Sequence, residues 1–210
     1  PLSELKSVVE VLDSEPVFDG RLVSLSRFTA DNYLSSIGEA LDCALPSAKM
    51  SEVDERDTPD SDESVFSLSA EQRQVYDDIL AAENNSLHLL FGVTGSGKTE
   101  VYLNIARKMM EDGKSVILLV PEISLSWQIF HRVKHAFGER AVLYHSALTP
   151  KERLKNWLSF YKGSAKIAVG TRSSIFMQCP DLGLIIIDEE HDASYKEHSS
   201  PRYSAKRIAV

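Results

Sequence analysis

A glycine-rich stretch in the middle of the chain has the composition of a phosphate-binding loop. It matches the P-loop pattern over Gly92, Val93, Thr94, Gly95, Ser96, Gly97, Lys98 and Thr99. Glycines let the backbone curl so that its N–H groups face phosphate oxygens, and the partial positive charge of a following helix adds to that attraction. Lys98 is placed to reach the β- and γ-phosphates of a nucleotide, and the Thr99 hydroxyl to bind Mg²⁺. The stretch predicts a nucleotide·Mg²⁺ site.

An apolar run that ends in acids supplies the second half of such a site. Residues 184–191 have the sequence LIIIDEEH, so Asp188 and Glu189 come directly after a buried strand. Open parallel sheets bind their ligands at the carboxyl ends of the strands. We expect Asp188 to hold the Mg²⁺ through its water shell. The predicted catalytic residues are Lys98, which contacts the phosphates, and Glu189, which acts as the general base for the attacking water.

Gln72 is a third candidate, upstream of the glycine-rich stretch. It closes the capping box Ser69-Ala70-Glu71-Gln72 at the start of a predicted helix. Its amide could bind the edge of adenine through two hydrogen bonds, although the capping role by itself also explains the residue.

Two further segments follow buried strands, at the same edge of the sheet. Pro121 and Glu122 come after residues 116–120, and Thr171 and Arg172 come after residues 167–169. Both segments therefore lie on the edge that carries the nucleotide site, although each, taken alone, is explained by an ordinary strand-to-helix turn.

Residues 191–203 (HDASYKEHSSPRY) interleave aromatic and cationic side chains. That mixture suits stacking on unpaired bases together with neutralisation of a phosphate backbone, and a plain polar loop is the alternative. The residues of interest here are His191, Tyr195, Arg202 and Tyr203.

These candidates require an alternation of strands and helices to position them. Apolar strands are predicted at 87–91, 116–120, 141–144, 167–169 and 184–187. Amphipathic helices are predicted after Ser69, from the glycine-rich stretch to about Glu111, before Gly138, and after the Thr149-Pro150 cap. The pattern predicts an α/β fold, with a mostly parallel doubly wound sheet covered on both faces.

Composition bounds the remaining possibilities. The chain has 210 residues, of which 43% are hydrophobic, and its formal net charge is −8. That charge argues against nucleic acid at first sight, but residues 51–64 hold seven acids against one base. This segment reads as a flexible, acidic linker. No apolar run approaches about 18 residues, so no membrane span is predicted. Cys43 and Cys179 are the only cysteines, which favours a reducing, cytoplasmic setting.

Five blocks, in order, closely resemble the first helicase lobe of the PriA family, the superfamily 2 DNA helicases of replication restart, here with a DEEH acid box. The blocks are GVTGSGKTEVYL, LVPEISLSWQ, LYHSAL with ERL after it, GTRSSIF, and IIIDEEHDASYKE followed by PRYSA. The resemblance implies a RecA-like P-loop lobe over residues 66–210, the acidic linker at 47–65, and the end of an N-terminal DNA-binding domain at 1–46.

The resemblance also implies roles and partners. The function implied is an ATP-dependent 3′-to-5′ DNA helicase that acts in primosome loading. Pro121 with Glu122, and Thr171 with Arg172, would touch single-stranded DNA, whereas His191, Tyr195, Arg202 and Tyr203 would belong to a loop that couples DNA to ATP hydrolysis. The partners implied are single-stranded and forked DNA, single-strand-binding protein and primosome proteins.

Several parts of the family pattern have no counterpart among these residues. They are the first half of the DNA-binding domain, the winged helix, the second lobe with its arginine finger, and the zinc module, whose ligands would lie outside this chain. A single lobe should turn over ATP weakly, because hydrolysis in such motors needs a cleft that closes. The alternatives are an inert DNA- or partner-binding module, an RNA helicase, or a small-molecule kinase, which the acid run disfavours.

Overall fold

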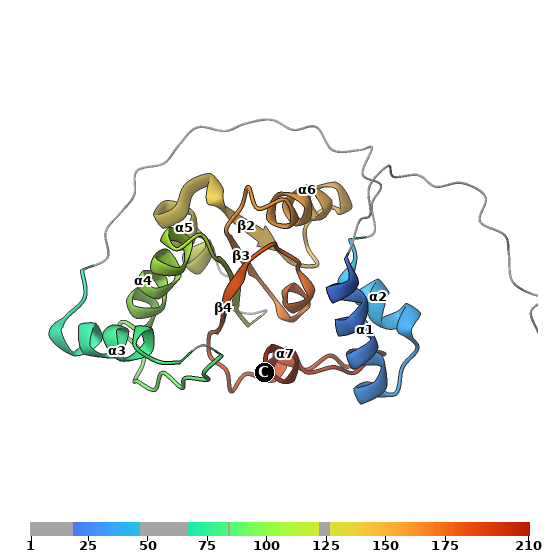
Figure 1. Cartoon of the computed structure of the whole chain (residues 1–210), viewed down its shortest axis with the longest axis horizontal. Coiled ribbons are helices and arrows are strands. Elements are labelled where there is room, and N and C mark those ends of the chain that lie inside the picture. The colour runs from blue at the N-terminus through green and yellow to red at the C-terminus, as the bar shows by residue number, and fades with distance from the viewer. Residues whose placement is uncertain (1–18, 47–66, 84, 122–126) are drawn as a thin grey trace, which may run out of the picture.

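The computed structural model describes residues 19–46, 67–83, 85–121 and 127–210 (Figure 1). Two features of the sequence lie outside these ranges: the whole acidic linker at 47–65 and Glu122. The predicted boundaries of the three parts of the chain stay predictions.

The centre of the molecule is a parallel sheet of four strands in the order β2-β3-β1-β4. The strands are β1 (Ser115–Leu119), β2 (Ala141–Tyr144), β3 (Ile167–Gly170) and β4 (Leu182–Ile187). Every residue of β1 and β3 is buried, as expected for central strands that are covered on both faces. The predicted α/β fold with a parallel sheet is confirmed.

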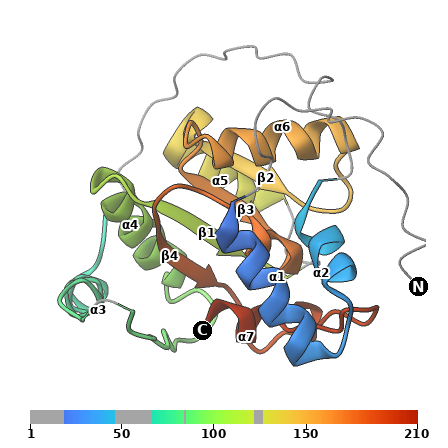
Figure 2. The same cartoon turned by 45° about the vertical axis from the view of Figure 1, so that its right-hand side comes forward.

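Helices cover both faces of the sheet (Figures 1 and 2). Val116 and Leu118 of β1 belong to a core with α4 (Lys98–Glu111) and α5 (Trp127–Phe137). Ile117 and Leu119 belong to a second core, which includes α6 (Pro150–Tyr161). Alternate side chains of β1 thus point into opposite cores, which is why this strand is apolar on both faces.

Local sequence signals set the helix ends. The capping box predicted at Ser69 and the N-cap predicted at Thr149 are both present, and they begin α3 (Ala70–Leu80) and α6. Thr149 forms a capping box as well, with Glu152. The shorter helical elements are η4 (Gly138–Arg140), η5 (Arg172–Phe176), η6 (Ala193–Tyr195) and α7 (Ala205–Ala209). No helix within the described ranges is long and apolar enough to cross a membrane.

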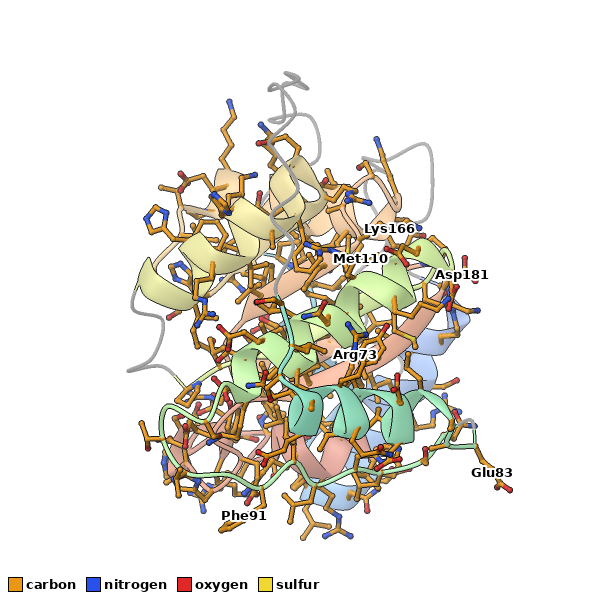
Figure 3. All side chains as sticks on the ribbon, turned by 90° about the vertical axis from the view of Figure 1, so that its left-hand side faces the viewer. Arg73, Glu83, Phe91, Met110, Lys166 and Asp181 are labelled. Atoms are coloured by element: carbon orange, nitrogen blue, oxygen red, sulfur yellow. The ribbon has the colours of Figure 1, made fainter. Side chains whose placement is uncertain are left out.

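The strand predicted at residues 87–91 is wrong. This segment pairs with no strand among the described residues, and the side chains of Leu87, Leu89 and Phe91 are 80%, 76% and 91% exposed. Figure 3 shows Phe91 at the outer rim of the molecule. An apolar run indicates that a segment can be buried, but it does not determine whether the segment pairs with a strand at the edge of the sheet. The glycine-rich stretch therefore opens a helix, as predicted, without following a strand.

The N-terminal helices α1 (Gly20–Tyr33) and α2 (Ile37–Ala44) pack against the sheet-containing part. Leu22 and Ala44 lie in the same buried cluster as Trp157 of α6. The Asp19 carboxylate caps α1 and accepts a hydrogen bond of 2.7 Å from the Gln178 amide. The described N-terminal helices therefore share a core with the sheet-containing part.

Candidate nucleotide site and nucleic-acid edge

The carboxyl ends of the four strands form one edge, and most of the candidate residues meet there. The backbone of this edge is tied together, because Asp188 N donates to Leu119 O and Val120 N to Gly170 O, each at 2.9 Å. Asp188 directly follows β4, and Thr171 directly follows β3. Pro121 comes shortly after the end of β1. Parallel pairing brings together residues that lie up to 67 positions apart, as counted from Pro121 to Asp188.

The glycine-rich stretch curls around its own lysine. Gly95 and Gly97 have φ of +82° and +79°, in the left-handed region that suits glycine. The Lys98 ammonium donates hydrogen bonds to Gly92 O at 2.6 Å and to Val93 O at 3.3 Å. The lysine is thus held by carbonyl oxygens of the loop, in positions that phosphate oxygens could take over.

Gln72 contacts this loop directly. Its Nε2 donates to Ser96 O at 2.9 Å, while its Oε1 accepts from Ser69 N at 2.9 Å. A Cβ on Gly97 would come within 2.2 Å of Gln72 Nε2, so a side chain at residue 97 would force the Gln72 amide to move. Both ends of the amide are engaged within the protein, which ties the capping box to the P-loop.

Asp188, Thr99 and Tyr102 form the centre of the site. Tyr102 donates a hydrogen bond of 3.4 Å to Asp188 Oδ2. Burial raises the pKa of the Tyr102 hydroxyl, and hydrogen bonding with the Thr99 hydroxyl partly opposes that rise. Burial raises the pKa of the Asp188 carboxyl, and the neighbouring charge of Glu189 adds to that rise. No motif in the sequence marked Tyr102; the signal that could have found it is its position three residues after Thr99, on the same face of α4.

These side chains fit a nucleotide with magnesium. Mg²⁺ prefers oxygen ligands and is usually bound through one or two carboxylates, with waters and substrate phosphates completing the shell. Thr99 and Asp188 provide a hydroxyl and a carboxylate that one tyrosine connects. Lys98 and the left-handed glycines supply positive charge and a curled backbone next to them.

Glu189 is held in an uncommon backbone conformation. Its φ is +45°, where a non-glycine residue carries strain on the order of 1 kcal/mol. The turn is closed by Glu189 N donating to Asp188 Oδ1 at 3.1 Å and by Asp192 N donating to Glu189 O at 2.9 Å. The exposed carboxylate lies 3.7 Å from Nε2 of His191. The turn thus presents Glu189 to solvent beside Asp188.

The second predicted DNA segment is tied to the aromatic-rich loop. Thr171 is buried, and the Arg172 guanidinium forms a 2.9 Å ion pair with Glu197 and donates to Ser194 O at 3.2 Å. In this structure Arg172 therefore holds residues 194–197 in place.

The aromatic-rich loop is divided into buried and exposed members. Tyr195 is fully buried, and its hydroxyl contacts the carbonyl oxygens of Leu119 and Asp188. Tyr203 is also buried and packs edge-on against Phe176, with ring centroids 5.0 Å apart. His191 and Arg202 are exposed, whereas Pro121 is buried. In this conformation neither tyrosine ring is open for a base to stack on.

Comparisons with known proteins agree with these features. The family described as DEAD/DEAH box helicase matches residues 69–208, and the family described as 3'DNA-binding domain (3'BD) matches residues 1–46. Replication restart protein PriA of Treponema pallidum is 39% identical over 98% of this chain and 32% of its own length. PriA of Bacillus subtilis is 44% identical over 68% of this chain and 18% of its own length. This chain thus spans about a third or less of these relatives.

Proposed function

This chain belongs to the DEAD/DEAH box helicase family, and on that premise we propose that it is part of a replication-restart DNA helicase of the PriA type. It would contain the first motor lobe and the end of the DNA-binding domain of an ATP-dependent 3′-to-5′ enzyme. The observation that carries the proposal is what meets at Asp188, directly after β4. The Lys98 charge acts on its carboxylate, and its carbonyl oxygen accepts a hydrogen bond from Tyr195, in the loop that Arg172 holds.

The nucleotide roles follow from the chemistry of each side chain. Backbone N–H groups from Gly95 to Gly97 and the Lys98 ammonium would bind phosphates, with Lys98 exchanging the carbonyls of Gly92 and Val93 for phosphate oxygens. Magnesium, when bound, would offset the phosphate charge, and Thr99 and Asp188 would hold it. Glu189 would accept a proton from the attacking water. Gln72 would act on the nucleotide through the Ser96 carbonyl and the shape of the loop.

The DNA roles fall on different parts of the edge. Arg202 and His191 are exposed and would meet the phosphate backbone. Pro121, Glu122, Thr171 and Arg172 are proposed as DNA contacts from the family resemblance. Tyr195 and Tyr203 would hold the loop that DNA displaces. The Tyr195 hydroxyl donates to the carbonyl oxygen of Asp188, which is itself a residue of the nucleotide site. A movement of this loop would therefore act directly on that site.

Further partners are proposed from the family alone. They are forked DNA, single-strand-binding protein and primosome proteins, which would place the protein in the bacterial cytoplasm. The 210-residue chain by itself should bind nucleotide weakly and hydrolyse it slowly, because it supplies one side of the cleft.

The test is Lys98→Ala in the full-length parent protein. DNA-stimulated ATP hydrolysis should fall at least about a hundredfold, because the variant lacks the charge that stabilises the transferring phosphoryl group. Lys151→Ala, at an exposed lysine near the start of α6, is the matched control and should leave turnover unchanged. Undiminished hydrolysis in Lys98→Ala would overturn the assignment, and so would a clear preference for RNA over DNA of matched sequence.

A further inference from the structure

Tyr102 occupies a place between the two halves of the nucleotide site that the proposed function leaves without a role. It lies on α4 one turn after Thr99, and its side chain faces β4. The residue is 6% exposed and packs in the core between α4 and the sheet. Its hydroxyl reaches out of that core to the carboxylate of Asp188 and to the hydroxyl of Thr99.

The direction of this hydrogen-bond chain follows from the groups themselves. A tyrosine hydroxyl has one hydrogen, and Tyr102 donates it to Oδ2 of Asp188. The Tyr102 oxygen can then only accept, so the hydrogen it shares with Thr99 comes from the Thr99 hydroxyl. The chain runs from Thr99 through Tyr102 to Asp188.

Such a chain prepares both end groups for a cation. A hydroxyl that binds a metal must direct a lone pair at it and place its hydrogen elsewhere, and Tyr102 accepts that hydrogen. At the other end, Oδ2 of Asp188 is held by Tyr102 and Oδ1 by the backbone N–H of Glu189. With both oxygens held, the carboxylate cannot rotate without breaking a hydrogen bond.

We propose that Tyr102 is a positioning residue for the metal site, whose hydroxyl sets the orientation of Thr99 and Asp188 toward one divalent cation. This inference rests on the proposed nucleotide·Mg²⁺ function of the same edge. Groups of this kind, which hold the ligands of a metal, typically change metal affinity by about 10- to 100-fold when they are removed.

Only the hydroxyl carries the role. The ring fills space in the core whether or not it bears oxygen, so Tyr102→Phe keeps the packing and removes the hydrogen-bond chain. Tyr161→Phe is the matched control, because Tyr161 stacks on Trp157 in α6, in the other core, at 4.9 Å between ring centroids.

The experiment measures binding by the 210-residue chain, without turnover. A fluorescent ATP analogue is titrated in excess EDTA and then at a series of Mg²⁺ concentrations, and the Mg²⁺ concentration at half-maximal enhancement is recorded. For Tyr102→Phe this concentration should rise about tenfold, while affinity in EDTA stays within about twofold of wild type. Tyr161→Phe should match wild type in both measurements.

Two results would overturn the inference alone. One is a Tyr102→Phe variant with the Mg²⁺ requirement of wild type. The other is an equal loss of affinity with and without Mg²⁺, which would mean that the hydroxyl serves only the fold. If the wild-type chain showed no Mg²⁺-dependent binding at all, the proposed function would fall, and the inference with it.

Discussion

At the scale of single residues, Glu197 fixes the conformation of the aromatic-rich loop through its hydrogen bonds and its ion pair. Its carboxylate accepts hydrogen bonds from the backbone N–H groups of His198 and Ser199 and forms the ion pair with Arg172. Burial disfavours its charge, but these hydrogen bonds and the Arg172 charge outweigh burial and lower its pKa to about 2. No sequence motif marked Glu197, because its partner lies 25 residues away.

This pKa shift predicts a pH-dependent contribution to stability. The carboxylate stabilises the folded state above its ordinary pKa of 4.5, and the effect is lost as the pH falls from about 5 towards 2. Glu197→Gln should lower the free energy of unfolding at pH 7 by on the order of 2 kcal/mol. Urea unfolding at pH 7 and at pH 3 measures the difference, which should shrink at the lower pH.

The control is Glu111→Gln, at an exposed carboxylate at the end of α4. It should change stability by less than about 0.5 kcal/mol at either pH. A loss for Glu197→Gln that is equally large at pH 3 would contradict the role given to its charge.

At the scale of elements, the nucleotide loop depends on the close approach between α3 and the start of α4. Gln72 bridges them through Ser96, and Gly97 is the residue that lets them touch. The capping box at Ser69 and the P-loop are separate sequence signals, yet they form one structural unit.

Gly97→Ala should therefore damage the loop beyond its backbone strain. A side chain in the left-handed region costs about 1–2 kcal/mol, and the added Cβ would also displace Gln72. Affinity for a fluorescent ATP analogue should fall at least about tenfold, corresponding to about 1.4 kcal/mol.

Gly113→Ala separates strain from contact, because Gly113 has the same φ of +79° and no atom within 4 Å of an added Cβ. It should lose similar stability and keep nucleotide affinity. Equal affinities for the two variants would show that the contact with Gln72 is unimportant.

At the scale of the whole molecule, the N-terminal helices and the helicase lobe share one core. Leu22 of α1 is 1% exposed and lies in the cluster that contains Trp157. Residues 19–46, the described part of the match to a DNA-binding family, therefore adjoin the helicase-family part through packed side chains.

Leu22→Ala should destabilise the whole described molecule. Removal of a buried leucine typically costs about 2–5 kcal/mol, and the loss should shift tryptophan fluorescence and far-ultraviolet circular dichroism to the same lower urea midpoint. Leu34→Ala, at a leucine that is 95% exposed, should have little effect. An unchanged fluorescence midpoint with early loss of helicity would instead mean that α1 unfolds by itself.

The sequence by itself determined what depends on neighbours along the chain. The capping boxes at Ser69 and Thr149, the left-handed glycines of the P-loop and the acids after β4 are local patterns, and local physics decides them. Alternation of apolar strands and helices was also enough for the α/β class and for the prediction that the site residues share an edge.

Only the tertiary structure decided what depends on contacts between distant segments. It left residues 87–91 outside the sheet, buried the rings of Tyr195 and Tyr203, and joined Tyr102 to Asp188 across 86 positions. Periodicity reports whether a residue can be buried, but burial and hydrogen bonding depend on which partner the fold brings, and that information is not local in the chain.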